Sequence, residues 1–217
     1  KKMVLTSYIN KEIDFDEENK QLLEEIISHG LSLGADFVEI FLENTDNISV
    51  LVEEDYITSV SPSFGKGAGI RVFKDKRDGF VSTNDLSKHG LMRSVSQAIE
   101  MLDISKSNKN KLFDGLQKLR DYSDSKADWI KLVPSINEVS EKLLLSTKSL
   151  NKDNKVSVRK GSYSRNWQEV IIASSDGTYA TDIRLHQTVG LNIIANDAQY
   201  RSSGSRRFGS SGIPNEF

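Results

Sequence analysis

Cysteine is absent from this sequence of 217 residues, and proline and histidine occur only three times each. The absence of cysteine excludes a disulfide scaffold and any thiolate metal ligand within the chain, and it fits a reducing compartment. The first residues lack the apolar core of a signal peptide, and no window approaches the roughly 20 apolar residues of a membrane helix. We therefore expect a cytoplasmic protein without membrane association.

An excess of either charge is also missing, because 29 Lys and Arg residues stand against 31 Asp and Glu residues. Basic residues cluster only locally, at positions 106–111 and 201–207. A balanced charge gives no general attraction to phosphates, so direct nucleic-acid binding is not expected. The apolar content of 37% is ordinary for a globular protein of one large or two small domains.

Recognisable catalytic motifs are absent as well. The histidines are isolated, since His29 and His89 each precede a glycine and His186 falls within an expected strand, so none is predicted to bind a metal. Neither a Gly-x-Ser-x-Gly elbow nor a P-loop occurs. The glycine-rich run at 65–69 leads into a strand rather than a helix N-terminus, which argues against a phosphate loop.

Three amphipathic helices are predicted from apolar residues at helical spacing, at residues 17–29, from about 87 to 103, and at 134–150. Alternating residues predict strands at 35–42, over a meander at 47–83, and at 155–163, 167–173, 179–185, 188–195 and 199–203. Turns are predicted at residues 164–166 and, from a strong Ser-Asp-Gly signal, at 175–177.

An offset of 121 positions superimposes the first hairpin-rich stretch on the second. It places Gly69 on Gly190, Val72 on Ile193 and Ser82 on Ser203 without a gap. We predict an α+β fold of duplicated helix plus antiparallel β-meander units, in two sheets with flanking helices; chance similarity between two hairpin-rich stretches is the alternative. The predicted division is 1–105 for the first half, 106–130 for a linker, 131–204 for the second half, and 205–217 for a flexible Gly/Ser tail.

Two features allow a plain and a functional interpretation. The glycines at 65, 67 and 69 either permit a bulge or close backbone approach, or leave room for an extended peptide to lie against the strand. The arginines within residues 202–207 either lie in a solvated loop or hold a carboxylate. Composition and spacing alone show no chemistry beyond these options.

Several longer patterns resemble the N-terminal region of the TldD/PmbA family, described as modulators of DNA gyrase and as zinc metallopeptidases, and they look closer to its TldD branch. They are Glu53-Glu54-Asp55, Gly67-Ala68-Gly69-Ile70-Arg71-Val72, Gly79-Phe80, Ser175-Asp176-Gly177, Asp182-Ile183-Arg184 and Gly204-Ser205-Arg206-Arg207-Phe208-Gly209. The resemblance spans about residues 35–209.

This resemblance implies a metallopeptidase subunit that pairs with a homologous subunit, as a homo- or heterodimer, and cleaves unfolded peptides. The family holds zinc on a His-Glu-x-x-x-His helix with a distant third ligand, and this sequence contains no His-Glu pair. We therefore expect zinc only in the full-length protein, no catalytic or metal residue in this chain, and no activity of the chain alone. Its end at Phe217 falls about where the family's catalytic domain is expected to begin.

The candidate peptide-binding residues are Gly67, Gly69, Arg71, Arg184, Arg206 and Arg207. Two alternatives stay open beside the peptidase interpretation. One is a non-enzymatic adaptor that binds DNA gyrase or a toxin-antitoxin partner, and the other is a structural duplication without activity.

Overall fold

The computed structural model describes residues 17–102, 113–121, 133–151 and 154–212. Its elements follow the chain as α1 (Glu17–Ser32), β1 (Phe37–Glu53), β2 (Tyr56–Lys74), β3 (Arg77–Thr83), α2 (Lys88–Glu100), β4 (Gln117–Asp121), α4 (Ile136–Ser149), β5 (Val156–Ser174), β6 (Thr178–Asn196) and β7 (Arg201–Ser211). None of the described helices is long and apolar enough to cross a bilayer.

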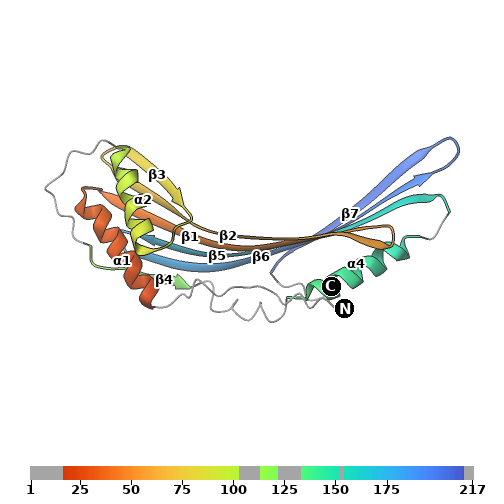
Figure 1. Cartoon of the computed structure of the whole chain (residues 1–217), viewed down its shortest axis with the longest axis horizontal. Helices are drawn as coiled ribbons and strands as arrows, with labels where there is room; N and C mark the ends of the chain where they lie inside the picture. The colour runs from red at the N-terminus through yellow and green to blue at the C-terminus, as the bar shows by residue number, and fades with distance from the viewer. Residues whose placement is uncertain (1–16, 103–112, 122–132, 152–153, 213–217) are drawn as a thin grey trace.

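The strands form one seven-stranded sheet in the order β3-β2-β1-β5-β6-β4, with β7 paired to β6 (Figure 1). Every pairing is antiparallel except that of β4 with β6. The α+β class is confirmed, whereas the prediction of two sheets is wrong. Because β1 pairs with β2 on one side and with β5 on the other, it joins the two predicted halves into one sheet.

Four of the strands are much longer than the usual five or six residues, and β1, β2, β5 and β6 each run for 17 to 19 residues. The turn predicted at residues 164–166 is wrong, because β5 continues through it. Arg165 lies there on the buried face between Tyr163 and Trp167, so a charged residue in an inward position hid the alternation of the strand.

The predicted linker and tail also contain strands. Residues 117–121 of the linker form β4, which pairs in parallel with β6. Residues 205–211 of the tail belong to β7, so the prediction of a flexible tail is wrong up to Ser211. Small side chains are typical of loops, but here backbone pairing with β6 determines the conformation. Positions 106–112 and 122–130 of the predicted linker and positions 213–217 of the predicted tail lie outside the described residues.

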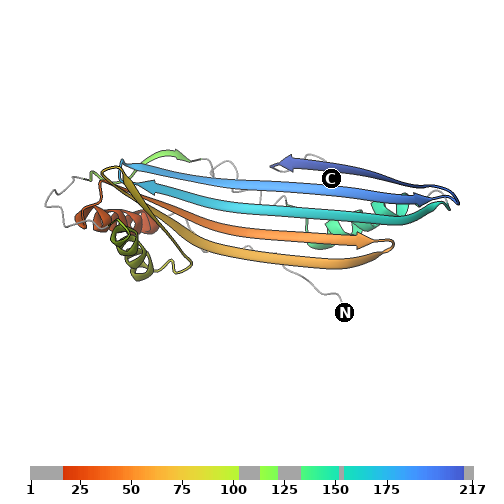
Figure 2. The same cartoon turned by 90° about the horizontal axis from the view of Figure 1, so that it is seen from above.

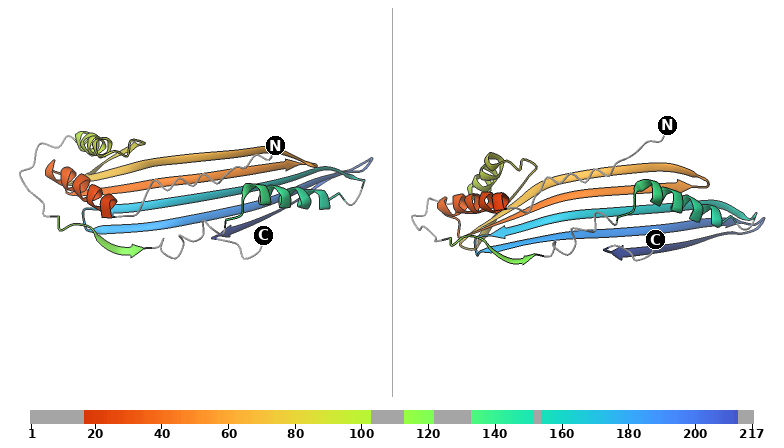
Figure 3. Two further views of the ribbon diagram at one scale, coloured as in Figure 1. Left: turned by 60° about the horizontal axis from the view of Figure 1, so that its bottom comes forward. Right: turned by 90° about the horizontal axis from the view of Figure 1, so that it is seen from below.

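All three described helices pack against one face of the sheet. Viewed from below, α1 and α4 lie in front of the strands at opposite ends (Figure 3). Inward side chains of β1 and β2, including Val38, Ile40 and Ile70, pack with Ile26 of α1 and Leu91 of α2. A smaller cluster, with Val50 of β1 and Leu143 of α4, lies at the other end. We call this side the helix face and the opposite side the open face, which Figure 2 shows from above.

The close approach of the first two helices depends on glycine. A Cβ atom on Gly30 of α1 would lie 2.7 Å from Val38 Cγ2 and 2.9 Å from Val95 Cγ1. The absence of that Cβ lets α1 pack directly on β1 and α2. Helix α1 then ends near Gly34, whose φ of 102° a residue with a side chain rarely adopts.

The ladder registers of the two long hairpins coincide at the offset found in the sequence. Phe41 of β1 pairs with Gly69 of β2, and Ser162 of β5 pairs with Gly190 of β6, each 121 positions later. Asp46 of β1 pairs with Trp167 of β5, which lies 121 positions beyond it. Equivalent positions of the two hairpins therefore face each other where β1 and β5 pair. The third strands deviate: β3 and β7 differ by four residues in register.

Candidate functional site

The middle of the open face is a shallow polar trough. One row across the sheet joins Ser61, Ser49, Ser164 and Thr188 through the registers of β2, β1, β5 and β6. The neighbouring row contains Ser63, Asn47, Asn166 and His186. These residues line a hollow of about 500 Å³. A sheet face that carries hydroxyl and amide groups in place of apolar side chains does not need to be covered by a helix.

Arg184 lies on the open face next to this trough, and its charge is already engaged. Its Nε donates to Asp182 Oδ2 at 3.0 Å, and its NH1 donates to Gln168 Oε1 at 3.3 Å. Gln168 Nε2 in turn donates to Glu43 Oε2 at 2.6 Å. This network runs across three strands, so Arg184 is held by its neighbours; its predicted contact with a peptide stays a prediction.

The glycines of β2 also face the open side, but neighbouring groups fill the space above them. A Cβ on Gly69 would lie 3.2 Å from the Phe80 ring, and one on Gly67 would lie 3.2 Å from Asn84 Oδ1. Above Gly65, Thr45 Oγ1 would be 2.9 Å away. The geometry therefore matches close side-chain approach to the backbone, which is the plain interpretation of these glycines.

Arg71 shares this end of the open face and is likewise paired. Its Nε and NH2 both donate to Asp78 Oδ2 at 3.1 Å, and its guanidinium carbon lies 4.7 Å from the centre of the Phe73 ring. Stacking on an aromatic ring and a two-pronged contact with a carboxylate hold the arginine flat on the sheet.

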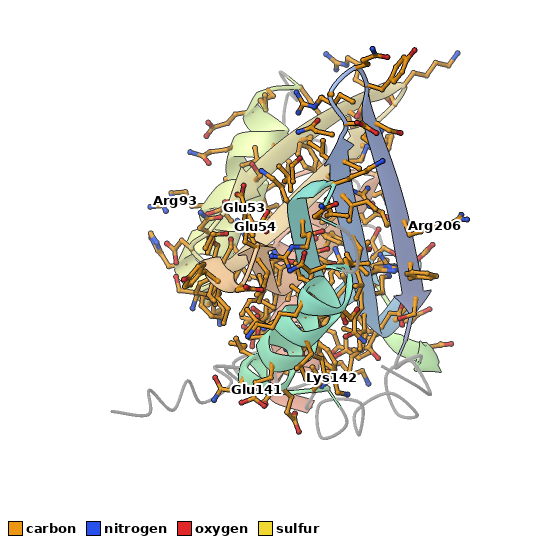
Figure 4. All side chains as sticks on the ribbon, turned by 90° about the vertical axis from the view of Figure 1, so that its right-hand side faces the viewer. Glu53, Glu54, Arg93, Glu141, Lys142 and Arg206 are labelled. Carbon is orange, nitrogen blue, oxygen red and sulfur yellow. The ribbon has the colours of Figure 1, made fainter. Side chains whose placement is uncertain are left out.

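The structure does not bring the predicted residues together. Gly69 lies in the row of Phe41 and Arg207 in the row of Leu51, which is ten residues further along β1. At about 3.3 Å per residue these rows are about 33 Å apart. Arg206 and Arg207 themselves leave β7 on opposite faces, because successive side chains of a strand alternate. Figure 4 shows the Arg206 side chain pointing away from the sheet.

A buried polar group on the helix face was missed by the sequence analysis. Arg165 NH2 donates to Asp46 Oδ1 at 3.2 Å, and both side chains are almost completely buried. Glu169 lies close by and accepts from Trp167 Nε1 and Asn44 Nδ2. These groups separate the two apolar clusters. Alternation through Tyr163, Arg165 and Trp167 was the available signal.

The tip of the β1–β2 hairpin is fixed to β5 by a buried arginine. Arg159 NH2 donates to Glu54 Oε2 at 2.7 Å, and the Arg159 backbone N–H donates to Glu54 Oε1 at 2.9 Å. The backbone and side-chain hydrogen bonds from Arg159 hold the pKa of Glu54 below its ordinary value. The bonds also stabilise the positive φ of 53° at Glu54, a backbone conformation that residues other than glycine rarely adopt. Glu53 and Glu54 lie together at this tip in Figure 4.

Tyr163 illustrates how polar groups are accommodated at the α4 end. Its hydroxyl donates to Gln187 Oε1 at 2.7 Å within the buried layer. Burial raises the pKa of Tyr163 to about 12. The hydroxyl therefore keeps its proton and its donor role throughout the physiological range.

The described residues do not fit a zinc site. Over the described ranges, no group of three or more His, Cys, Asp or Glu side chains is arranged to hold a metal ion. Three or four such ligands are what zinc requires, so no hydrolytic step can be derived from these side chains.

Family models cover most of the sequence. A model described as PmbA/TldA metallopeptidase domain 1 matches residues 38–102, and the PmbA/TldA metallopeptidase central domain matches residues 120–216. The chain belongs to the PmbA/TldD family. It contains the first and the central domain of PmbA/TldD proteins.

Curated relatives in the PmbA/TldD family are distant in sequence. The metalloprotease MJ0996 of Methanocaldococcus jannaschii is 22% identical over 90% of this chain, and a metalloprotease TldD homolog of Buchnera aphidicola is 22% identical over 96%. In both cases the chain spans 42% of the relative's length.

Solved structures share the fold. TldE from Thermococcus kodakarensis superimposes with a TM-score of 0.69 at 20% identity, covering 89% of this chain and 43% of TldE. A candidate modulator of DNA gyrase from Bacteroides thetaiotaomicron gives a TM-score of 0.69 at 18% identity, covering 92% and 46% of the two chains. At these identities the likeness concerns the fold of PmbA/TldD proteins.

Proposed function

We propose that this chain is the substrate-side and assembly region of a zinc-dependent metallopeptidase that cleaves unfolded peptides. Its place in a metallopeptidase family, together with a long sheet face that has a polar trough at its middle and is covered by no described helix, carries this proposal. The metal ligands and the catalytic residues would belong to the remainder of the full-length protein.

The open face suits an extended peptide. Its central trough offers hydroxyl and amide groups that can donate and accept hydrogen bonds without selecting one side-chain type. A protease that acts on many unfolded sequences needs contacts of this general kind, since backbone groups are the part that all peptides share.

The outer edge of β2 suits a second, homologous subunit. Strand β3 pairs only with Ala68–Lys74, so no described strand pairs with the outer edge of β2 over residues 56–65. Tyr56, Ile57, Val60 and Phe64 are exposed along this edge. Exposed apolar residues beside an unpaired strand edge mark a protein interface, because burying the apolar side chains is favourable and another strand can pair with the backbone.

Zinc content and peptide cleavage test the proposed function. We expect the full-length protein to bind about one zinc ion per chain and to degrade an unstructured peptide, as a site with three protein ligands and a bound water would. We expect residues 1–217 alone to do neither. Stoichiometric zinc retained by purified residues 1–217, measured by metal analysis, would contradict the assignment.

A non-enzymatic adaptor for DNA gyrase is the second candidate, favoured by the description of the Bacteroides thetaiotaomicron protein as a candidate gyrase modulator. A pull-down with this chain distinguishes the two functions. Salt-resistant capture of gyrase subunits would favour the adaptor, since purely electrostatic contacts weaken with salt.

We also propose that the two halves derive from one duplicated unit of a helix and three strands. The shared offset of 121 positions in the β1–β2 and β5–β6 ladders supports this origin. Superposing the two hairpins within a solved relative tests it. A consistent offset is expected there, and hairpins of different register would contradict the duplication.

A further inference from the structure

The open face contains a second hollow near the end of the sheet that α4 covers from below. It has a volume of about 460 Å³. One row of its lining runs through Ser162, Gly190 and Arg207 on β5, β6 and β7, and the next row contains Lys160 and Asn192. We call these five residues the distal recess.

The floor of the distal recess is bare backbone at Gly190. A Cβ on Gly190 would lie 2.7 Å from Ser162 Oγ, so a side chain does not fit without displacing that hydroxyl. The same Cβ position lies 3.9 Å from Arg207 Nε, which places the guanidinium beside the exposed backbone. Unlike the space above Gly69, which the Phe80 ring occupies, this space is bordered by hydrogen-bond donors.

Arg207 differs in its partners from five of the ten arginines of the sequence. Arg71, Arg93, Arg159, Arg165 and Arg184 each contact a carboxylate at 2.7–3.3 Å. The Arg207 side chain forms no ion pair or hydrogen bond with any described residue, although its backbone pairs with Gly190 of β6. Lys160 is 3.2 Å from Glu53, which also borders the hollow. This single acid stands beside two bases of the open face, Lys160 and Arg207, so the recess keeps a net positive charge.

We propose that the distal recess binds a carboxylate of an extended peptide on the open face. A guanidinium presents paired N–H donors that match the two oxygens of a carboxylate, and the ammonium, amide and hydroxyl groups nearby add single donors. This inference rests on the proposed function, and it adds a preference for peptides with an acidic group. The carboxylate can belong to an Asp or Glu side chain or to the peptide C-terminus.

Binding of fluorescently labelled, unstructured peptides to the full-length protein, measured by anisotropy without turnover, tests this recess. Four versions of one peptide are compared: Glu or Gln at an internal position, each with a free or an amidated C-terminus. Loss of affinity on changing Glu to Gln assigns the side chain, and loss on amidation assigns the terminus. We expect one of these changes to weaken binding about tenfold or more, as losing a charge-assisted contact should.

Arg207→Ala should lower the affinity for the preferred acidic peptide to that for its neutral counterpart, and it should leave the affinity for the neutral peptide unchanged. Arg206→Ala is the matched control: Arg206 also borders the hollow, but its side chain leaves the same strand on the other face, so the substitution removes the same charge from outside the recess. Circular dichroism verifies that both variants are folded.

Equal binding of acidic and neutral peptides by the unmodified protein would overturn the recess while leaving the proposed function intact. Equal losses in Arg207→Ala and Arg206→Ala would also overturn it, since only net charge would then matter. Absence of binding to every peptide version would overturn the proposed function together with the recess.

Discussion

The two ends of the sheet are built from the same kinds of element but are covered unequally. At one end, α1 and α2 together enclose a large core in which Ile26, Ile40 and Val95 have no exposed surface. At the other end, α4 is the one described helix that covers Val50, Val52 and Tyr163, and Val189 and Leu191 of β6 stay half-buried. One end therefore has a complete core of its own, while the other is a thin layer.

This difference suggests a division of labour within the molecule. The thick end anchors the fold, because tightly packed interiors resist local opening. The thin end leaves surfaces free on both sides: an apolar hollow of about 300 Å³ beside Phe208 on the helix face, and the distal recess on the open face. If the distal recess binds peptide as proposed, stability and binding reside at opposite ends of one set of strands.

Truncating a core leucine at each end should give the largest effects and test the difference directly. Leu91→Ala in α2 should lower the free energy of unfolding by about 4 kcal/mol, since its surroundings cannot collapse into the cavity. Leu143→Ala in α4 should cost about 2.5 kcal/mol, because Leu143 borders the open hollow beside Phe208. Urea unfolding followed by circular dichroism measures both, and equal losses would contradict the difference in packing.

Adding a methyl group to a buried glycine at each end should give the next largest effects. A Cβ on Gly79 would meet the Ala98 carbonyl oxygen of α2 at 2.2 Å, so Gly79→Ala must displace a helix backbone and should cost about 3 kcal/mol. A Cβ on Gly161 would meet Thr147 Oγ1 at 2.8 Å and Leu143 Cδ1 at 3.0 Å. Those side chains can move, so Gly161→Ala should cost only about 1 kcal/mol.

Thermal unfolding of the two alanine variants decides whether α4 is the more compliant helix. A larger drop in melting temperature for Gly161→Ala than for Gly79→Ala would reverse the comparison and show that the α4 end is the rigid one.

Acid should weaken the thin end through the contact between Glu54 and Arg159. Because folding lowers the pKa of Glu54 from its ordinary 4.5, the stabilisation is fully present above pH 4.5. It is lost as the pH falls through the lower, folded pKa. Glu54→Gln should therefore cost about 1 kcal/mol at pH 7, a modest value because Glu54 is partly exposed, and progressively less below pH 4.5.

Asp78→Asn provides the matched control at the thick end, since the pair of Asp78 with Arg71 is exposed on both sides. Its effect should stay within a few tenths of a kcal/mol. Urea titrations from pH 7 to pH 3 compare the two variants, and a Glu54→Gln cost that does not change with pH would refute the proposed contribution of the carboxylate.

Local pattern was enough to predict the helices and the hairpin turn, but not the joining of the strands. The apolar stripe with Leu143 and the Asp176-Gly177 turn depend on neighbours in sequence, and both are confirmed. The pairing of Asp46 with Trp167 joins two strand edges that are 121 positions apart in sequence, and the periodicity of side chains within one strand does not predict which edges pair. The strand predicted at 199–203 covers only the start of β7, and the rest of β7 was missed because its Ser and Gly residues have little intrinsic preference for a sheet.

The candidate residues show the same limit. Sequence could single out Gly69 and Arg207 separately, but only the registers show that they lie far apart and that Gly190 adjoins Arg207. Lys160 and Asn192 were missed because nothing in their local sequence marks them. They become part of the proposed recess because β5 and β6 pair with each other and β7 places Arg207 beside them.

The helix caps should give the smallest effects and the finest comparison of the two ends. Ser87 accepts from the Gly90 N–H at the start of α2, and Ser135 accepts from the Glu138 N–H at the start of α4. Ser87→Ala and Ser135→Ala should each lower the free energy of unfolding by about 0.5–1 kcal/mol, since each frees one backbone donor.

The local consequences should nevertheless differ, because α2 is held by a large core and α4 by a small one. Amide hydrogen exchange should show lost protection across the first turn of α4 in Ser135→Ala and little change in α2 in Ser87→Ala. If both helices fray alike, the size of the core beneath a helix does not control its local stability, and the division into an anchoring end and a binding end loses its physical basis.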